Sequence, residues 1–450
     1  MRRMTSDLRL PRSWWRDFER SAWNKQPALL KNPVSGGFPT SDELFEGMLS
    51  AAHALRNGDL SEEHSFRLTL EHPDDPRRGE AGPLSSMVVL CHPYLPSERD
   101  GSLQNYVARL EETFAGFRFG LIFNSSVKHS WNHWLQMSSF LEGLGSVLGM
   151  PLAGADTAVF VGNYRYTPFG IHKDEYHVFN FVVHGEKKMC LWPLETFADR
   201  PEIPKTPDLA HRNANTVMKA TELEAALKTA EVLVGQPGDI QYWPPSWWHI
   251  APPSESLNVT ISLGIAYRPP TLIPGIKATD SSGRLPAREV PDQRTAAHWP
   301  VPREIRATLP RASAAGRAGS SARTAALEGW LKLITGSGFN TAPALVEFPA
   351  LGKGERIHAH PRRPIVVAEA NASTFIVSCN GHACTMTGAA QLRRTVRMIV
   401  ERLNRGRPVA LHELESSFVG PKTALKKPAL HALLQRLGTW RALERSSAAP

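Results

Sequence analysis

The sequence predicts a mainly β protein with interspersed helices, built as a barrel or sandwich and followed by a second, basic region. Between about residues 87 and 267, short apolar or alternating runs recur between turn residues, and their β-branched and aromatic content is typical of strands. After residue 268 the composition shifts to Pro, Gly, Ser, Ala and Arg. From about residue 324, helix-like and strand-like patterns resume, which indicates a further folded region.

Composition is that of a folded chain with more than one domain. The protein has 450 residues, of which 42% are hydrophobic and 21% charged, and no apolar run is long enough to span a bilayer. The basic N-terminus lacks the apolar core of a secretory signal, and four cysteines do not resemble a disulfide framework. We therefore expect a cytoplasmic protein.

Charge is distributed unevenly between the two regions. Residues 301–450 contain 22 Lys and Arg against 9 Asp and Glu, so the net charge of +9 belongs to the C-terminal third. A basic surface of this kind would suit nucleic acid or a ribonucleoprotein, and a merely solvated basic surface is the alternative.

The elements follow in order along the chain. Residues 1–60 predict a lead-in with a helix at about 13–23 and an extended stretch after it, where Pro27 forbids helix continuation. The main β domain is predicted at 61–270. Its expected strands are 86–90, 119–123, 158–166, 179–185, 187–193, 239–245 and 258–267, with helices at about 103–115, 133–148 and 221–229.

The second half predicts two further segments. Residues 271–335 read as a linker or helical region rich in Pro, Gly, Ser and Arg, ending in a helix at 324–334. Residues 336–450 predict a basic domain with strands at 364–370 and 373–379 and helices at 389–404 and 428–443. Two helices flanking a β-wing would account for this pattern.

Three His-x-Asp/Glu pairs occur, and their contexts differ. The pair His72/Asp74 falls in a polar loop, and the pair His184/Glu186 flanks Gly185 in a tight turn between strands. His172 and Asp174 instead follow an extended stretch and precede a strand. Residues i and i+2 of a strand point to one face, so an imidazole and a carboxylate can there share a metal ion.

A third ligand is predicted at His249. It lies in a stretch with a Gly-Asp turn, a strand, a Pro-Pro corner and flanking tryptophans, which would bring a distant histidine into a barrel mouth. Two histidines and one carboxylate form a facial triad that leaves three positions of an iron open for oxidant and substrate. A packed core histidine is the alternative for His249.

Lys187 begins the strand that returns after the Gly185 turn, so it can point into the same interior, whereas alternation turns Lys188 outward. An iron of this class needs a two-electron donor, and 2-oxoglutarate needs a buried cation for its distal carboxylate. Lys187 is the candidate for that cation.

The sequence HKDEYHVFNFVVHGEKKMCLWP, which starts at His172, resembles that of the JmjC protein hydroxylases, and most closely that of the ribosomal oxygenases. GDIQYWPPSWWHIAPP and TISLGIAYRPP, together with the opener FERSAWNKQPALL, are similar to that group over about residues 10–270. Residues 370–443 look like its C-terminal winged helix. The resemblance implies a distorted double-stranded β-helix of the cupin/JmjC type, with iron on His172, Asp174 and His249 and 2-oxoglutarate on Lys187.

Other cosubstrate contacts follow less directly from this resemblance. Many relatives carry Ser or Thr and Asn where this sequence has Phe169 and Val178. Thr260 and Asn124 are the first candidates to replace those contacts, followed by Asn180 and Ser262. An aromatic mouth that clamps a substrate side chain is predicted from Tyr176, Tyr242, Trp243, Trp247 and Trp248.

The implied activity is hydroxylation of an amino-acid side chain in a protein or peptide, ribosomal proteins included, with release of succinate and CO2. The same chemistry on a peptide natural product or free amino acid is an alternative. An alternative of another class is a catalytically silent cupin that acts as a basic protein- or RNA-binding module. The expected cofactors are Fe(II) and 2-oxoglutarate, and the family's helical region before the wing implies a homodimer.

Overall fold

The computed structural model describes residues 8–34, 38–71, 87–89, 92–164, 170–207, 209–252, 256–267, 284–285, 316–352, 354–420 and 423–446. The chain divides into two units: Met1–Leu148 with Ala155–Ala266, and Gly149–Gly154 with Tyr267–Pro450. The pair His72/Asp74 and most of the segment 271–335 lie outside the described residues. In the part of the chain that is described, no helix is both long and apolar enough to cross a membrane.

The first unit consists of two antiparallel sheets with helices on the outside. The large sheet has the order β1-β12-β8-β14-β6-β4-β2-β3, and the small sheet has the order β10-β7-β13-β9-β11. The large sheet comprises β1 (Ala28–Leu30), β2 (Phe66–Glu71), β3 (Met87–Val89), β4 (Arg118–Asn124), β6 (Ala155–Gly162), β8 (His177–His184), β12 (Ile240–Trp243) and β14 (Asn258–Ile265). The small sheet comprises β7 (Ile171–Lys173), β9 (Lys187–Pro193), β10 (Ala214–Thr216), β11 (Glu231–Gly235) and β13 (Trp247–Ile250).

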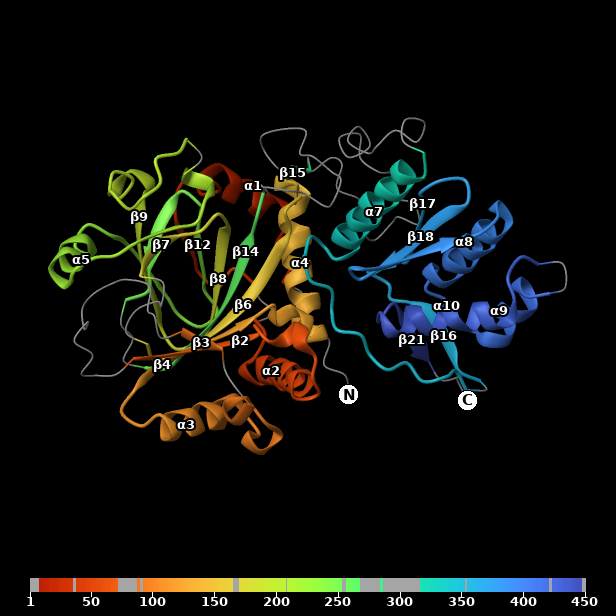
Figure 1. The fold of residues 1–450 in the computed structure, drawn as a ribbon, viewed down its shortest axis with the longest axis horizontal. Coiled ribbons are helices and arrows are strands. Elements are labelled where there is room, and N and C mark those ends of the chain that lie inside the picture. Colours follow the sequence, from red (N-terminus) through yellow and green to blue (C-terminus); the bar gives the residue numbers. More distant parts are fainter. Residues whose placement is uncertain are drawn as a thin grey trace. The chain divides into compact units, whose positions relative to one another are not determined.

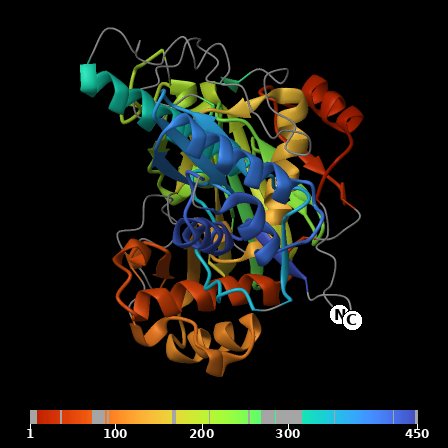
Figure 2. The same ribbon diagram turned by 90° about the vertical axis from the view of Figure 1, so that its right-hand side faces the viewer.

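In the described residues five α-helices accompany these sheets: α1 (Arg12–Ser21), α2 (Ser41–Arg56), α3 (Leu103–Thr113), α4 (Trp131–Leu148) and α5 (Ala220–Leu227). α2 and α3 lie side by side in both ribbon views (Figures 1 and 2). α4 covers the outer face of the large sheet, because the ring of Phe140 packs edge-on against Phe179 and Phe181 of β8. The predicted mainly β fold with helical interludes is thereby confirmed. The prediction missed α2, although its Thr40/Glu43 capping box is a start signal visible in the sequence.

A buried carboxylate links the 3-10 turn η1 (Leu60–Glu62) to the 3-10 turn η4 (Ser126–Lys128). Glu62 of η1 is 1% exposed and accepts hydrogen bonds from Lys128 and Ser65. Burial alone would raise the pKa of Glu62, but hydrogen bonds from His129, Lys128 and Ser65 outweigh it and lower the pKa to about 2. The ionised form therefore stabilises the folded state.

Glu62→Gln is expected to lower the free energy of unfolding by about 3 kcal/mol at neutral pH. Because the folded-state pKa is depressed, this contribution is complete above the ordinary value of 4.5 and disappears as the pH falls toward 2. Denaturant titrations of wild type and variant across that range measure the gap. The exposed neighbour variant Glu63→Gln is the control, and a gap that stays constant with pH would contradict the assignment.

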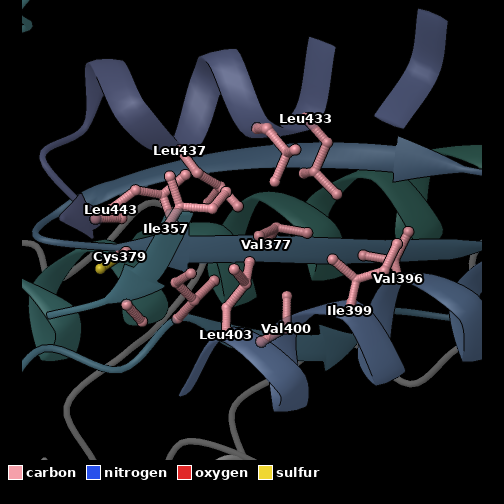
Figure 3. Packing of buried hydrophobic residues seen from close by; sticks show 14 of the residues in the cluster. Ile357, Val377, Cys379, Val396, Ile399, Val400, Leu403, Leu433, Leu437 and Leu443 are labelled. Atoms are coloured by element: carbon pink, nitrogen blue, oxygen red, sulfur yellow. The ribbon is translucent and has the colours of Figure 1, made fainter. Parts of the chain in front are cut away.

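In the second unit the sheet β17-β18-β19 lies between helices. Its elements are β5 (Met150–Pro151), β15 (Arg284–Leu285), α7 (Gly316–Thr335), β16 (Arg356–Ala359), β17 (Val366–Glu369), β18 (Thr374–Cys379), β19 (His382–Thr387), α8 (Ala390–Asn404), β20 (Val409–Ala410), α9 (Leu411–Phe418), α10 (Lys427–Thr439) and β21 (Leu443–Ser446). Ile376 of β18 faces the cluster with Trp330 of α7. Its neighbour Val377 faces Ile399 of α8 and Leu437 of α10, as Figure 3 shows.

These elements match the helices and strands expected after residue 324, and the hairpin β18–β19 turns at Asn380 and Gly381, both at positive φ. The winged-helix assignment of this unit stays a prediction.

Candidate active site

The three predicted metal ligands meet on two adjacent strands of the small sheet. His172 lies on β7 and Asp174 directly follows this strand, and His249 of β13 pairs with His172 across the antiparallel ladder. One donor atom from each of the three residues lies within 4.8 Å of the other two. His249 Nε2 is 3.5 Å from Asp174 Oδ2, and the two imidazole centroids are 4.1 Å apart. The strand period that was read from the sequence thus places the three donors on one face.

The geometry fits a metal ion. Donors that each bind an ion at about 2.1 Å are separated from one another by about 3.0–3.4 Å, which is close to the observed spacing of His249 and Asp174. His172 Nδ1 lies 3.0 Å from the carbonyl oxygen of Gly170, so a proton on Nδ1 leaves Nε2 as the ligand atom. Gly170 adopts φ +69°, a left-handed conformation that suits glycine.

His249 is held in its neutral form. Its side chain is buried, and this burial, aided by the nearby His172, lowers the pKa of His249 well below 6.5. A neutral imidazole is the form that ligates metals. The Trp243 ring packs 4.9 Å from the imidazole and keeps bulk water from this side of the site.

Lys187 lies in the same cavity with its ammonium buried. It is 5% exposed, and its Nζ donates to the Tyr164 hydroxyl and, at 3.3 Å, to Asn258 Oδ1. Lys188 is exposed, as alternation predicts. Within the described residues Lys187 has no carboxylate partner. A buried ammonium with only neutral partners leaves a positive charge uncompensated, which suits an anionic ligand.

A cavity of about 470 Å³ joins these groups between the two sheets. The small sheet supplies the metal donors and Lys187, and the large sheet supplies Trp243, Thr260, Asn180 and Ser262 to the lining. Thr260 therefore lies where a cosubstrate contact was expected. Tyr164 and Asn258, which the sequence reading missed, stand beside Lys187 because β14 and the chain after β6 adjoin the β8–β9 turn.

Asn124 does not reach this cavity, and its predicted cosubstrate role is wrong. Its Nδ2 donates to the carbonyl oxygen of His64 at 2.9 Å, at the end of β4. Asn124 is separated from β14 by the intervening strand β6, and it is absent from the cavity lining.

The structure contradicts the predicted aromatic mouth at Tyr242 and Trp248, and of its five rings Trp243 is the one in the cavity lining. Tyr242 and Trp248 are the strand neighbours of Trp243 and His249 and point to the opposite faces. The Tyr242 hydroxyl lies 3.0 Å from His177 Nδ1, and Trp248 Nε1 donates to the Leu194 carbonyl. Two further residues also lie outside the lining: Trp247, which is only partly buried, and Tyr176, which is 36% exposed beside Gly264.

Gln241 links the large sheet to the small sheet. The side chain is fully buried, and its Nε2 donates to the carbonyl oxygens of Lys187 at 2.8 Å and Leu233 at 3.0 Å. Its Oε1 accepts a hydrogen bond from Asn180 Nδ2 at 2.8 Å. One side chain of the large sheet thus fixes two strands of the small sheet, including the residue that carries the buried ammonium.

Gln241→Leu is expected to lower the free energy of unfolding by about 3 kcal/mol or more, since it removes three buried hydrogen bonds. Denaturant unfolding measures this. Gln236→Leu is the matched control, because the Gln236 side chain is exposed and its one hydrogen bond to a described residue is to Glu186. Equal losses in the two variants would refute the role given to Gln241.

One family model matches the part of the chain that carries the site. Residues 60–263 match the family model of the cupin-like domain. Among solved structures, Escherichia coli ribosomal oxygenase YcfD is 16% identical, with 98% of this chain and 100% of that chain covered at a TM-score of 0.45. The same protein in complex with cobalt and 2-oxoglutarate is 16% identical, with 96% and 98% covered at a TM-score of 0.43. No curated protein matches the chain.

With TM-scores below 0.5, these structures do not decide the fold. The family match and the two facing antiparallel sheets do so, and they agree on the segment that holds all three metal donors and Lys187. Residues 60–263 of this chain are therefore a cupin-like domain.

Proposed function

We propose that this chain is an Fe(II)- and 2-oxoglutarate-dependent oxygenase that hydroxylates an amino-acid side chain of a protein or peptide and releases succinate and CO2. One observation carries the proposal: a single cavity contains the His172/Asp174/His249 donor set and a buried lysine with no carboxylate partner among the described residues. The first feature suits iron and the second suits a dicarboxylate.

The spacing along β9 supports the second half of the proposal. His249 pairs with Leu191, and Lys187 lies four residues earlier on the same strand. At about 3.3 Å per residue the two strand positions are about 13 Å apart. The lysine side chain and a five-carbon dicarboxylate together are of the right length to cover this separation.

Each residue would have a defined task. His172, Asp174 and His249 would hold the metal from one side, which leaves adjacent positions free for other ligands. When bound, iron would supply the redox chemistry that couples decarboxylation of 2-oxoglutarate to hydroxylation of the substrate. Lys187 would pair with the distal carboxylate, and Thr260 lines the wall between the two sheets. Trp243 would keep water from the metal.

A resemblance in sequence supports the choice of substrate. The stretch that begins at His172 resembles the ribosomal oxygenases, so ribosomal proteins are the first candidates for the hydroxylated partner. Such a partner would place the enzyme in the cytoplasm. The free thiols of Cys190, Cys379 and Cys384 are consistent with that reducing compartment.

Purified protein with Fe(II), ascorbate and 2-oxoglutarate is expected to release succinate, and a chelator is expected to abolish the release. Binding is measured separately, by the visible charge-transfer band that 2-oxoglutarate forms with Fe(II) in the absence of oxygen. The proposal is overturned if the protein releases no succinate and binds neither Fe(II) nor 2-oxoglutarate.

A further inference from the structure

Two asparagines extend the cavity wall beyond the metal donors. Asn215 of β10 pairs directly with His172 of β7, and both Asn213 and Asn215 line the cavity. Ala214, between them, also borders the cavity, and its methyl group joins the apolar cluster of Ile171. Asn213 and Asn215, which we call the asparagine shelf, therefore stand on the face that carries the metal site.

The shelf is fixed to the strand of the metal donors. Lys173 is 1% exposed, and its Nζ donates to the carbonyl oxygens of Leu209, at 2.6 Å, and Arg212. The backbone N–H of Glu175 donates to Asn213 Oδ1 at 2.9 Å. Residues on both sides of Asp174 thus hold the segment that leads into β10, so the shelf keeps its place relative to the donors.

The amides of the shelf are available to a ligand. Both side chains are exposed, and β10 is the outermost strand of the small sheet as far as the structure describes it. In the described part of the chain Asn215 makes no side-chain hydrogen bond, and Asn213 uses only its oxygen. A primary amide offers both donor and acceptor groups, which complement the carbonyl and N–H of a peptide unit.

The spacing of the shelf selects the ligand. Residues i and i+2 of a strand are about 6.6 Å apart, which is the repeat of an extended peptide. Two amides at this spacing can bind successive peptide units that face the same way. A free amino acid has no second peptide unit to engage.

We infer that the asparagine shelf binds the main chain of an extended peptide segment and so positions one of its side chains over the metal. This inference rests on the proposed oxygenase function and narrows its substrate to peptide segments. The shelf residues act as specificity determinants, because they contact substrate atoms that do not react.

The test uses capped peptides of about 15 residues, long enough to cross the cavity when extended, that tile the ribosomal proteins. Peptides that raise succinate release and gain one oxygen by mass are then made with N-methyl groups on the main-chain amides flanking the oxidised residue. Four enzymes are compared: wild type, Asn213→Ala/Asn215→Ala, the single variant Asn215→Ala, and Asn57→Ala as an exposed control at the C-cap of α2.

We expect capped peptides to stimulate the wild type and N-methylation to remove most of the stimulation. The double variant should raise the peptide KM about tenfold or more, through the loss of two hydrogen bonds to the peptide. The single variant Asn215→Ala, which leaves the Asn213–Glu175 bond intact, should also raise the peptide KM and keep the thermal midpoint of wild type. A peptide KM unchanged in the double variant would overturn the inference.

The pattern of succinate release distinguishes a failure of the asparagine shelf from a failure of the oxygenase proposal. Succinate release that responds to free amino acids but to no capped peptide overturns the asparagine shelf and leaves the oxygenase standing. Absence of all succinate release overturns the oxygenase and the shelf with it.

Discussion

Asp174→Ala is expected to lower the affinity for Fe(II) more than about 100-fold and to abolish succinate release. The variant removes the only anionic donor of the set. Even mutation of residues that only hydrogen-bond to metal ligands typically lowers metal affinity about 10–100-fold. Iron content after desalting and succinate release measure the two effects. Asp174 is one-third exposed, so the apo-protein should unfold like the wild type.

The chain carries its own matched control. His184 and Glu186 have the spacing of His172 and Asp174, but both are exposed beside the β8–β9 turn. Glu186→Ala should therefore bind iron and release succinate like the wild type. Iron retained by Asp174→Ala, or lost equally by Glu186→Ala, would rule out the assigned metal site.

Lys187→Met is expected to raise the KM for 2-oxoglutarate about 10- to 100-fold, the equivalent of about 1.5–3 kcal/mol for a hydrogen bond to a charged group. Methionine keeps the aliphatic stem and removes the ammonium, so the cavity stays filled. Fe(II) affinity should be unchanged, because Lys187 is not among the donor set.

Stability separates this role from a structural one. The ammonium is buried with only Tyr164 and Asn258 as described partners, and an uncompensated buried charge destabilises the folded state. The apo form of Lys187→Met should thus be at least as stable as the wild type in denaturant. A less stable variant with an unchanged KM would show that Lys187 serves only the packing; Lys188→Met, at the exposed neighbour, is the control.

Much of the site could be predicted from local pattern. The i, i+2 spacing of His172 and Asp174 on an extended segment dictates a common face in any sheet. The Gly185 turn, at φ +71°, fixes which of Lys187 and Lys188 faces inward once one face is apolar. Strands rich in β-branched and aromatic residues could be predicted for the same reason, because the alternation of their side chains indicates which face is buried.

Other features depend on contacts that no local pattern records. β10 is a strand only because Asn215 pairs with His172, and its own sequence is polar and short. Tyr164 and Asn258 join Lys187 through neighbouring strands far apart in the sequence. The failure of the aromatic mouth has the same origin: alternation separates Tyr242 from Trp243, but only the packing of α1 against Tyr242 decides which ring leaves the cavity.

The sequence by itself determined the chemistry of this protein: two histidines and a carboxylate at metal-binding spacings, a lysine after a tight turn, and strands to carry them. These follow from periodicity and turn geometry, which act over a few residues. The tertiary structure alone decided which polar side chains surround the metal and the lysine, excluded Asn124 and brought in Asn213 and Asn215. Strand order decides this, because neighbours across a ladder come from distant parts of the chain.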